Sequence, residues 1–498
     1  MEDNTLLAAI DLGSNSFRLE IGRVEHDQLQ RIEYLKETVR QGAGLDASRN
    51  LSREAMERGW DCLARFAERL TNFKKKQVRV VATQTLREAR NRDVFLERGH
   101  EILGFPIDVI SGKEEARLIY LGVSHLLPQS LERRLVIDIG GRSTELILGQ
   151  GYTANTMESY RVGSVTWSMK YFPKGEVTKE AFRLAEIAAK AILDEALATY
   201  NKRHWDNAYG SSGTVGAIAD ILAGLGHPLD KITRNGLAQL KDVLQKSWLM
   251  DRVKLEGLKE DRRPVLCGGL SVLSALFDLL GIDTLHVAAG ALRQGVLYDM
   301  IEREYNATDV RSSTVMRMTH IFKTDQIQAG RVSGIAHLLF DQIMPKQDRS
   351  VFESLARKLM WAAQLHEIGS HISHTDYHKH GAYILDNVDA VGFAQHELHR
   401  LGLLVLGHKG KLRKLGEHLN DATFAYQLLA LRLAVIACHA RSNPDWSSVR
   451  LVLKNNTFIL QVPSTWTQTH PQSIHLLQQE TEAWQKTTWT FQLNTAKE

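Results

Sequence analysis

The chain has 498 residues, 43% of them apolar and 24% charged, and its formal net charge is +4. This composition is typical of a globular protein, and the length suggests roughly three domains. Uncharged apolar runs stay well below the roughly 18 residues that span a bilayer, which argues against a transmembrane protein. The net charge is too small to indicate nucleic-acid binding by itself.

The N-terminal stretch MEDNTLLAAIDLG has no basic region ahead of its apolar part, so it does not resemble a secretory signal. Cys62, Cys267 and Cys438 are far apart and odd in number, which indicates neither a disulfide framework nor a cysteine-based zinc site. We therefore expect a protein of the reducing cytoplasm, with peripheral attachment to a membrane left open.

The first structural signal is LAAIDLGSNSFRLEIG at residues 7–22, which has the pattern of a strand, a turn and a second strand. The turn consists of Gly13, Ser14, Asn15 and Ser16. Glycine lets backbone N–H groups approach a ligand closely, and successive N–H groups in a tight turn bind anions. The segment predicts a phosphate-binding turn, although an ordinary hairpin turn rich in Gly and Ser has the same pattern.

Helix and strand signals alternate in the next hundred residues. Residues 52–73 predict an amphipathic helix with Ser52 as its N-cap, and residues 78–83 and 106–111 predict strands. Such alternation indicates an α/β domain.

A further helix is predicted to begin after Ser111, in ISGKEEARLIYLGV. Ser111 and Glu114 match a capping box, which gives the Glu114 carboxylate a structural role. Glu115 points about 100° further around the helix and has no capping role. Its carboxylate is either a base that activates water beside a phosphate or an acid that the first helical turn favours, and the spacing leaves both interpretations open.

Residues 135–149, LVIDIGGRSTELILG, repeat the pattern of residues 7–22. When Asp11 is laid on Asp138, the segments agree at four further positions: Gly13 with Gly140, Ser16 with Ser143, Leu19 with Leu146, and Gly22 with Gly149. A repeated unit indicates duplicated domains that face one another. Two facing turns of this kind would clamp a phosphate.

Acidic residues flank the second turn. Asp138 ends one strand of the predicted hairpin, and Glu145 begins the return strand. Carboxylate oxygens suit Mg²⁺, which binds phosphate substrates through one or two carboxylates plus water. Asp11 is the matching acid of the first copy, where the alternative is an Asp that only accepts backbone hydrogen bonds.

The second half of this region continues in the same style. A helix is predicted around 178–200, and YGSSGTVGAIADILAG at 209–224 places a glycine-rich turn before a helix start, where backbone N–H groups and the helix dipole favour an anion. A strand over 284–289 then leads into GALRQGVLYDMI. A second α/β domain is therefore expected.

The character of the chain changes near residue 304. Helical patterns dominate until a hairpin over 449–462 that turns at Asn455-Asn456, and fourteen of the 20 histidines lie in this part. Two basic runs, 73–79 and 408–414, are either solvated faces or contacts for a polyanion.

Six segments, in this order, closely resemble the exopolyphosphatase / guanosine pentaphosphate phosphohydrolase family: DLGSNSF, ATQTLREARN, ISGKEEARLIYLGV, DIGGRSTEL, GSSGT and GALRQGVLYDM. The helical region, with AAQLHEIGSHISHTDYHKHGAYIL at 362–385, resembles the extension of the long bacterial members.

This resemblance implies duplicated actin/Hsp70/sugar-kinase-like (ribonuclease H-like) α/β domains at 1–125 and 126–303. It implies a helical HD-like domain at 304–445 and a small C-terminal α+β domain at 446–498. The implied reaction is the Mg²⁺-dependent removal of terminal phosphate from inorganic polyphosphate, from guanosine pentaphosphate, or from both. HKHGAYIL and the basic run at 408–414 favour polyphosphate. The long members are typically homodimers, so we expect one here.

The resemblance also assigns roles by position. Glu115 falls on the catalytic glutamate, and Asp138 and Glu145 fall on essential acids that would hold the metal. The implied phosphate-binding residues are Gly13, Ser14, Asn15, Ser16, Arg40, Arg87, Gly140, Gly141, Ser143, Gly210, Ser211, Ser212, Gly213 and Thr214. For Arg40 and Arg87 the alternative is a structural ion pair, and for Arg293 it is packing.

Arg142 departs from the family, which usually has Gly or Ala at this place in the loop. An arginine here binds a further phosphate, swings out to solvent, or requires a different backbone conformation. We hypothesise that Arg142 faces the cleft and favours polyanionic substrates.

The helical domain resembles the HD fold, whose metal site uses a His-Asp pair. Here the pair is His366-Glu367, so we expect no working metal phosphohydrolase in this domain. His378 and His380 are remnants of a site, contacts for polyphosphate, or plain surface residues. Two rivals to a phosphatase are a kinase of the same superfold and a protein that senses guanosine polyphosphates without hydrolysing them; the Glu-Glu helix start favours hydrolysis over a kinase.

Overall fold

The computed structural model describes residues 4–25, 28–303, 308–345, 349–443 and 445–496. These residues form two compact units, Met1–Asp309 (unit 1) and Val310–Glu498 (unit 2). Each unit has its own hydrophobic core and is described by itself.

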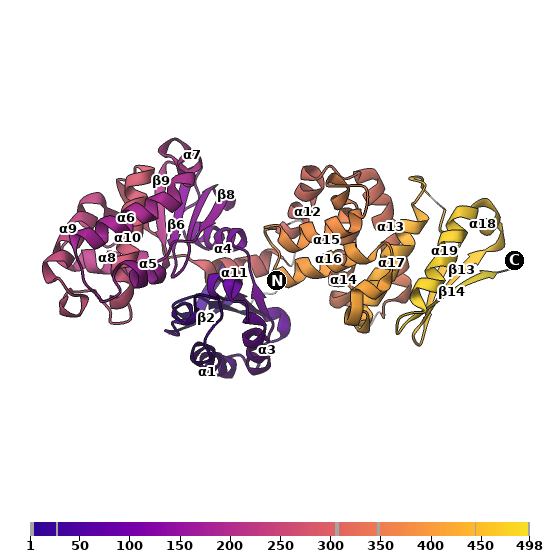
Figure 1. The fold of residues 1–498 in the computed structure, drawn as a ribbon, viewed down its shortest axis with the longest axis horizontal. Helices are drawn as coiled ribbons and strands as arrows, with labels where there is room; N and C mark the ends of the chain where they lie inside the picture. Colours follow the sequence, from indigo (N-terminus) through magenta and orange to yellow (C-terminus); the bar gives the residue numbers. More distant parts are fainter. Residues whose placement is uncertain (1–3, 26–27, 304–307, 346–348, 444, 497–498) are drawn as a thin grey trace. The chain divides into compact units, whose positions relative to one another are not determined.

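Unit 1 contains two sheets, visible in Figure 1 on the indigo and magenta parts of the ribbon. The first sheet has the order β3-β2-β1-β4-β5. We call the part of unit 1 that is built on this sheet lobe I. Its strands are β1 Leu6–Leu12, β2 Phe17–Glu25, β3 Gln28–Glu37, β4 Val78–Ala82 and β5 Ile107–Val109. The strands β1 to β3 are antiparallel neighbours, whereas β4 and β5 run parallel to β1.

The second sheet has the order β10-β11-β9-β6-β7-β8. We call the part of unit 1 that is built on this second sheet lobe II. Its strands are β6 Arg133–Ile139, β7 Thr144–Gln150, β8 Thr153–Tyr160, β9 Asn207–Ser211, β10 Lys231–Thr233 and β11 Thr284–Val287. An antiparallel β6-β7-β8 meander is followed by β9 and β11, which run parallel to β6. The lobe II path β8-β7-β6-β9-β11 thus repeats the lobe I path β3-β2-β1-β4-β5, as the repeated hairpins of the sequence predict.

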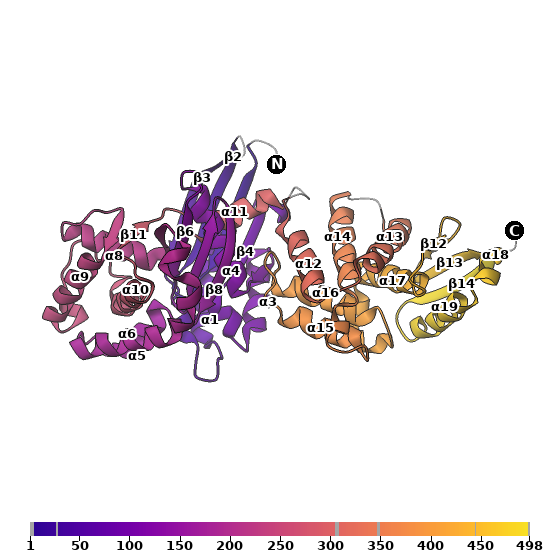
Figure 2. The same ribbon diagram turned by 90° about the horizontal axis from the view of Figure 1, so that it is seen from above.

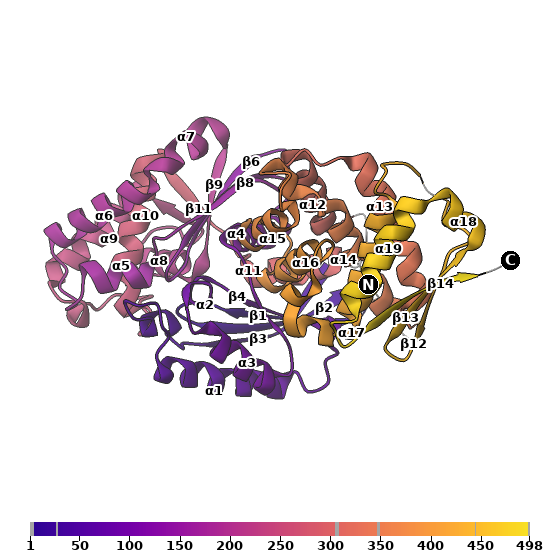
Figure 3. The same ribbon diagram turned by 45° about the vertical axis from the view of Figure 1, so that its right-hand side comes forward.

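The helices of unit 1 cover the sheets. Their bounds are α1 Arg53–Arg69, α2 Gln84–Glu88, α3 Arg92–Leu103, α4 Gly112–His125, α5 Ser164–Tyr171, α6 Lys179–Leu193, α7 Leu197–Tyr200, α8 Ser212–Gly224, α9 Arg234–Ser247, α10 Leu266–Leu280 and α11 Leu292–Glu302. Figure 3 shows α1 and α3 together on one face of the first sheet, where their apolar side chains join the core of lobe I. The Ser52 side chain accepts a hydrogen bond from the Ala55 N–H, which confirms the expected N-cap of α1.

The helices α4 and α11 pack against each other and share a core with residues of both sheets. Glycines let their backbones touch: a Cβ atom at Gly295 would lie 1.7 Å from the Leu118 carbonyl oxygen, and one at Gly122 would lie 2.1 Å from that of Ala291. Because only glycine tolerates such an approach, these positions hold α4, whose first turn carries Glu115, against α11.

One stretch of unit 1, Arg263–Leu280, is long and apolar enough to cross a membrane by length and composition, and 72% of it is buried inside the protein. It includes α10, which supplies side chains such as Leu270 and Leu273 to the core of lobe II. Such burial is expected of a core helix.

Unit 2 is mainly helical, with a small sheet of order β12-β13-β14. Figure 2 shows its helices α12 to α17 in shades from salmon to orange and the sheet with α18 and α19 in yellow. The bounds are α12 Val310–Ile321, α13 Gln326–Ile343, α14 Arg349–Leu365, α15 Tyr377–Asn387, α16 Gln395–Gly407, α17 Ala422–Ala437, β12 Arg450–Lys454, β13 Thr457–Pro463, α18 Ser464–Thr469, α19 Pro471–Trp484 and β14 Thr490–Ala496. The expected hairpin is present, with Asn455 at φ +50° in its turn. One core runs from Val315 through the helices to Phe491 in the sheet.

Candidate active site

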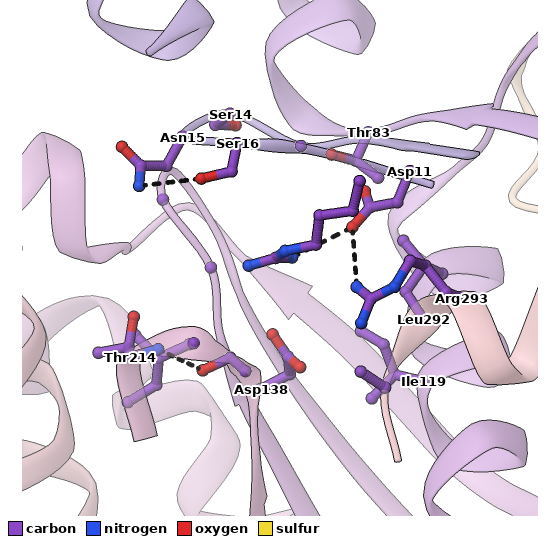
Figure 4. A pocket seen from close by; sticks show the side chains of 18 of the residues that line it. Asp11, Ser14, Asn15, Ser16, Thr83, Ile119, Asp138, Thr214, Leu292 and Arg293 are labelled. Atoms are coloured by element: carbon purple, nitrogen blue, oxygen red, sulfur yellow. Dashed lines mark hydrogen bonds and ion pairs between the residues drawn. The ribbon is translucent and has the colours of Figure 1, made fainter. Parts of the chain in front are cut away.

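A cavity of about 420 Å³ lies between the lobes of unit 1. Figure 4 shows Asp11, Ser14, Asn15 and Ser16 of lobe I on one side and Asp138 and Thr214 of lobe II on the other. The residues that line it include twelve of the sequence-predicted ones: Gly13, Ser14, Asn15, Ser16, Glu115, Asp138, Gly140, Gly141, Ser143, Ser212, Gly213 and Thr214.

The two hairpin turns face each other across this cavity. A Cβ atom added at Gly141 would lie 3.1 Å from the Ser14 Cβ and 3.6 Å from the Asn15 nitrogen, so the two turns lie close together. Both turns have the same local shape. A Cβ added at Gly13 would lie 3.0 Å from the Ser16 carbonyl oxygen, and a Cβ added at Gly140 would lie 3.2 Å from the Ser143 carbonyl oxygen. The duplication has therefore produced two matching turns that meet at one cavity.

The third predicted loop ends β9 and begins α8. Ser212 has φ +88°, a conformation that is strained for a residue with a side chain. Its Oγ accepts hydrogen bonds from the N–H groups of Thr214 and Val215 at 3.2 and 3.3 Å. Gly210 and Ser211 do not appear among the lining residues: a Cβ at Gly210 would clash with Leu285. The Ser211 hydroxyl donates to the Gly290 carbonyl at 3.0 Å.

Glu115 lies in the first turn of α4 and lines the cavity with only 7% of its surface exposed. Its Oε2 lies 3.2 Å from Nη1 of Arg87. Burial raises the pKa of Glu115 to about 7, although the Arg87 charge and hydrogen bond pull the pKa the other way. A carboxylate with a pKa near neutrality is suited to accept a proton from water.

A buried ion network anchors the start of α4. The Ser111 half of the capping box is confirmed, since its Oγ accepts from the Glu114 N–H at 3.1 Å. The Glu114 carboxylate, expected to reach back to the helix start, instead accepts two hydrogen bonds from Arg117, at 2.8 and 2.9 Å. Arg117 also pairs with Asp299 of α11 at 2.5 Å. Glu114 and Arg117 therefore tie α4 to α11, while Glu115 turns to the cavity.

The matching acids of the two hairpins have opposite surroundings. Asp11 lies directly opposite Arg18 in the β1–β2 register, and its Oδ2 is 3.2 Å from Arg18 and 3.8 Å from Arg293. Figure 4 shows Asp11 beside Arg293 in the cavity. Asp138 lies directly opposite Glu145 in the β6–β7 register. Like charges that face each other across an antiparallel strand pair repel. In lobe II, therefore, each of these two carboxylates has another acid, and not a cation, as its cross-strand neighbour.

Burial raises the pKa of Asp138 to about 6, although a Ser211 hydrogen bond and Arg18 oppose the shift. Burial, with the charges of Glu115 and Asp138, raises the pKa of Glu145 well above its ordinary value. Glu145 Oε1 accepts from Ser159 at 2.7 Å, whereas Glu145 Oε2 is buried and has no hydrogen-bond partner among the described residues. Glu145 itself is not among the lining residues of the cavity.

Asp138 and Glu145 are the acids that the sequence predicts to hold Mg²⁺. The described residues contain no group of three or more His, Cys, Asp or Glu side chains that could hold a metal ion alone. Mg²⁺ commonly binds through one or two carboxylates plus substrate phosphates and water. The orphaned Glu145 oxygen and the repelling pair fit such a partial site.

Three predicted arginines lie outside the lining of the cavity. Arg87 donates to the Ile110 carbonyl at 2.8 Å as well as to Glu115, so it holds the glutamate from behind. Arg40 is exposed at φ +53°, and its N–H donates to the Asn15 carbonyl of the turn at 2.9 Å.

The structure places Arg142 differently from our hypothesis. Its guanidinium pairs with Glu88 at 3.0 Å and donates to the Gly42 carbonyl at 3.0 Å, both in lobe I. Arg142 therefore bridges the lobes beside the cavity instead of facing into it, because Glu88 offers a charge partner within reach.

Sequence reasoning missed five residues that add positive charge or an aromatic ring to the lining: Arg18, Tyr34, Lys36, Lys259 and Arg262. Arg293, for which packing was the alternative, also lines the cavity. A signal for Arg18 was present, because it follows Asp11 by the same seven positions that separate Glu145 from Asp138. Lys259 and Arg262 come from a distant loop, and only folding brings them here. The Arg262 guanidinium fills the space beside Gly213, where a Cβ would lie 2.2 Å from it.

Comparisons with known proteins place these features in context. A model of the Ppx/GppA phosphatase family matches residues 21–304, and one of Ppx/GppA phosphatase, domain III, matches residues 310–481. A protein of Vibrio atlanticus is 39% identical over 94% of this chain and 93% of its own length. One of Pseudoalteromonas translucida is 39% identical over 98% of both chains. Both are named guanosine-5'-triphosphate,3'-diphosphate pyrophosphatase.

Among solved structures, the Aquifex aeolicus member of the Ppx/GppA family is 25% identical, covers 61% of this chain and 99% of its own, and has a TM-score of 0.50. An exopolyphosphatase from Cytophaga hutchinsonii is 23% identical, covers 60% of this chain and 98% of its own, and has a TM-score of 0.54. The likeness to the second structure shows the fold alone. The expected actin-like fold is confirmed.

Proposed function

Because the chain belongs to the Ppx/GppA phosphatase family, we propose that it hydrolyses guanosine pentaphosphate by removing the terminal phosphate of the 5'-triphosphate. The observation that carries this choice is the pair of relatives named for guanosine-5'-triphosphate,3'-diphosphate, each aligned over more than nine-tenths of both chains. The sequence-based preference for polyphosphate rested on short basic stretches and is the weaker of the two.

The chemistry of the cavity supports a substrate with several phosphates. Two glycine-containing turns and the start of α8 offer backbone N–H groups. Arg18 and Lys36 line the cavity while paired with Asp11 at 3.2 Å and Asp261 at 2.6 Å, and Arg262 adds a positive charge. Arg262 is 8% exposed, and its Nε lies 3.7 Å from Asp261, its one acid partner among the described residues. Buried positive charge without a close partner favours the binding of an anion. The ring of Tyr34 in the same lining is suited to contact with a nucleoside.

In the proposed mechanism Glu115 orients a water molecule and accepts its proton while the water oxygen attacks the terminal phosphorus in line. The bond from that phosphorus to the bridging oxygen breaks, so orthophosphate is released and the bridging oxygen stays on the shortened nucleotide. Arg87 fixes the carboxylate through the 3.2 Å ion pair, and the network of Glu114, Arg117 and Asp299 fixes the helix turn that presents it. The turn N–H groups bind the phosphate oxygens, where charge spreads in the transition state. Catalysis here is mainly positioning plus electrostatic stabilisation.

We propose that Asp138 and Glu145 hold Mg²⁺, which when bound neutralises charge on the phosphate oxygens. The unpaired Glu145 oxygen and the raised pKa values of both acids support this assignment, because a cation would relieve the repulsion between them. Asp11 is less suited, since two arginines already neutralise it.

Inorganic polyphosphate is the second candidate substrate. It presents the same terminal phosphate, and the cations around the cavity do not depend on a nucleoside. The deciding experiment measures phosphate release from guanosine pentaphosphate and from long polyphosphate side by side with Mg²⁺. A kcat/KM that is at least about tenfold higher for the nucleotide supports the proposal. Equal or higher values for polyphosphate reject it, and no release from either rejects the phosphatase mechanism. Light scattering tests the predicted homodimer.

A further inference from the structure

Unit 2 has a pocket of its own, of about 890 Å³, which the proposed reaction does not use. We call it the unit-2 pocket. Its walls come from the residues just after α14, the start of α15, the chain after α16, α17 and α19. They include His366, Tyr377, Arg432, Ile436 and Lys486. Its size lies within the range of pockets that bind small molecules.

The rim of the unit-2 pocket is positively charged. Lys409, Lys411 and Arg413 lie on the loop, Lys486 follows α19, and all four side chains are exposed. No ion pair of Lys411, Arg413 or Lys486 occurs in the part of the chain that the structure describes. The Lys409 Nζ lies 4.9 Å from the centroid of the Tyr377 ring. These free cations face a site of defined shape, which distinguishes them from a solvated surface run.

The loop that carries the rim is held from below. Arg432 is 6% exposed and makes a bidentate pair with Glu480, at 2.5 and 2.6 Å. Its Nη1 also donates to the carbonyls of Gly407 and Gly410, at 2.6 and 3.1 Å. The Lys414 Nζ donates to the Lys409 carbonyl at 2.5 Å. Because folding has already fixed the loop, ligand binding loses less conformational entropy.

The inner part of the pocket offers hydrogen-bond acceptors. His366 Nδ1 lies 2.7 Å from the Ala363 carbonyl oxygen. A carbonyl oxygen only accepts, so Nδ1 carries the hydrogen and Nε2 is an acceptor in the neutral ring. Burial lowers the pKa of His366, which favours that neutral form. Glu367 adds carboxylate oxygens, one of them 2.6 Å from Arg441.

The remaining wall is apolar. It is lined by Leu412, Val435, Ile436 and Ala483. Basic rim, apolar wall and buried acceptors thus occur together in one cavity. A simple polyanion needs only the first of these features, whereas a nucleotide matches all three, because its base has an apolar face and N–H donors at its edge.

We propose that the unit-2 pocket binds a nucleoside polyphosphate, with its phosphates on Lys409, Lys411 and Arg413, its base against the apolar wall, and the N–H groups of the base on the acceptors around His366. This site is separate from the cavity of unit 1, and the proposal does not rest on the proposed function.

The test uses the full chain and GDP as the probe, with titration calorimetry to count sites. The variant Lys409→Glu/Lys411→Glu/Arg413→Glu reverses the rim. The control variant Arg317→Glu/Lys323→Glu/Lys454→Glu changes the net charge equally at three exposed positions of unit 2 outside the pocket. Circular dichroism and thermal unfolding verify that both variants are folded.

The parent chain should bind GDP at the unit-2 pocket. The dissociation constant for GDP at this site should rise at least about tenfold in the rim variant and less than about twofold in the control, since each charge-assisted hydrogen bond to phosphate contributes substantially to binding. Phosphate release at the unit 1 site should stay within about twofold in both variants. Unchanged GDP affinity and site number in the rim variant would overturn the proposal. Equal affinity of this site for inorganic tripolyphosphate and for GDP would overturn the assignment of a nucleotide.

Discussion

The substitution Glu115→Gln tests both the catalytic role of this residue and the electrostatics of the cavity. Glutamine keeps the size of the side chain and can still bond to Arg87, but it cannot accept a proton from water. We expect turnover to fall by about 10² to 10⁴, the usual contribution of a general base. Glu97→Gln is the matched control, because Glu97 is exposed on α3 away from the cavity, and it should keep full turnover.

The same substitution has a calculable effect on stability. Burial raises the pKa of Glu115 from its ordinary 4.5 to about 7, and at 1.36 kcal/mol per pKa unit this corresponds to about 3 kcal/mol. A raised pKa means that the folded chain keeps a proton that the unfolded chain has released. The parent chain therefore loses stability as pH rises from about 4.5 to about 7. The glutamine variant has no such group at this position.

Denaturant unfolding of both proteins in Mg²⁺-free buffer, detected by far-UV circular dichroism, measures this effect. The difference in free energy of unfolding, variant minus parent, should grow by about 3 kcal/mol between about pH 4 and about pH 8. The pH dependence of this difference cancels any constant effect of losing the ion pair with Arg87. A difference that stays flat would refute the buried, raised-pKa state, and turnover retained in the variant would refute the role as base.

Three further predictions concern the metal, the helix contact and Arg142. Asp138→Asn should raise the Mg²⁺ concentration for half-maximal phosphate release at least about tenfold, and an unchanged Mg²⁺ titration would remove Asp138 from the metal site. Gly295→Ala should destabilise unit 1 by about 1–3 kcal/mol in chemical unfolding, because the new Cβ would overlap the Leu118 carbonyl. Gly216→Ala is the control: its Cβ would enter open space, so the substitution should be neutral or slightly stabilising. Arg142→Ala should leave KM for long polyphosphate within about twofold, because Arg142 is paired with Glu88; a clear rise in KM would return Arg142 to substrate binding.

The duplicated hairpins differ in one decisive place. Each has an Asp entering its turn, but the residue across the strand pair is Arg18 in lobe I and Glu145 in lobe II. The first acid is neutralised within the protein, and the second is paired with another acid. The lobe I hairpin therefore contributes an internally paired acid to the lining, whereas the lobe II hairpin contributes the carboxylates that we propose hold a cation.

The sequence by itself determined the local elements and the duplication. Strand and helix periodicity, the Ser52 and Ser111 caps and the repeated Asp-x-Gly turns depend on residues close together in the chain, so they could be read directly. Glu114 and Glu115 do turn to different surroundings, because adjacent residues on a helix point in different directions, but the Glu114 carboxylate bonds to Arg117 and not to the start of the helix as predicted.

Only the tertiary structure decided how the charges are paired and which residues share the cavity. Lys259 and Arg262 reach the cavity from a loop far along the chain, and Arg142 turns away from it because Glu88, 54 positions earlier, lies within reach. The raised pKa values of Glu115 and Asp138 likewise depend on burial that the whole fold creates. Charge pairing and desolvation depend on distances between elements, and those distances exist only once the two lobes have packed around α4 and α11.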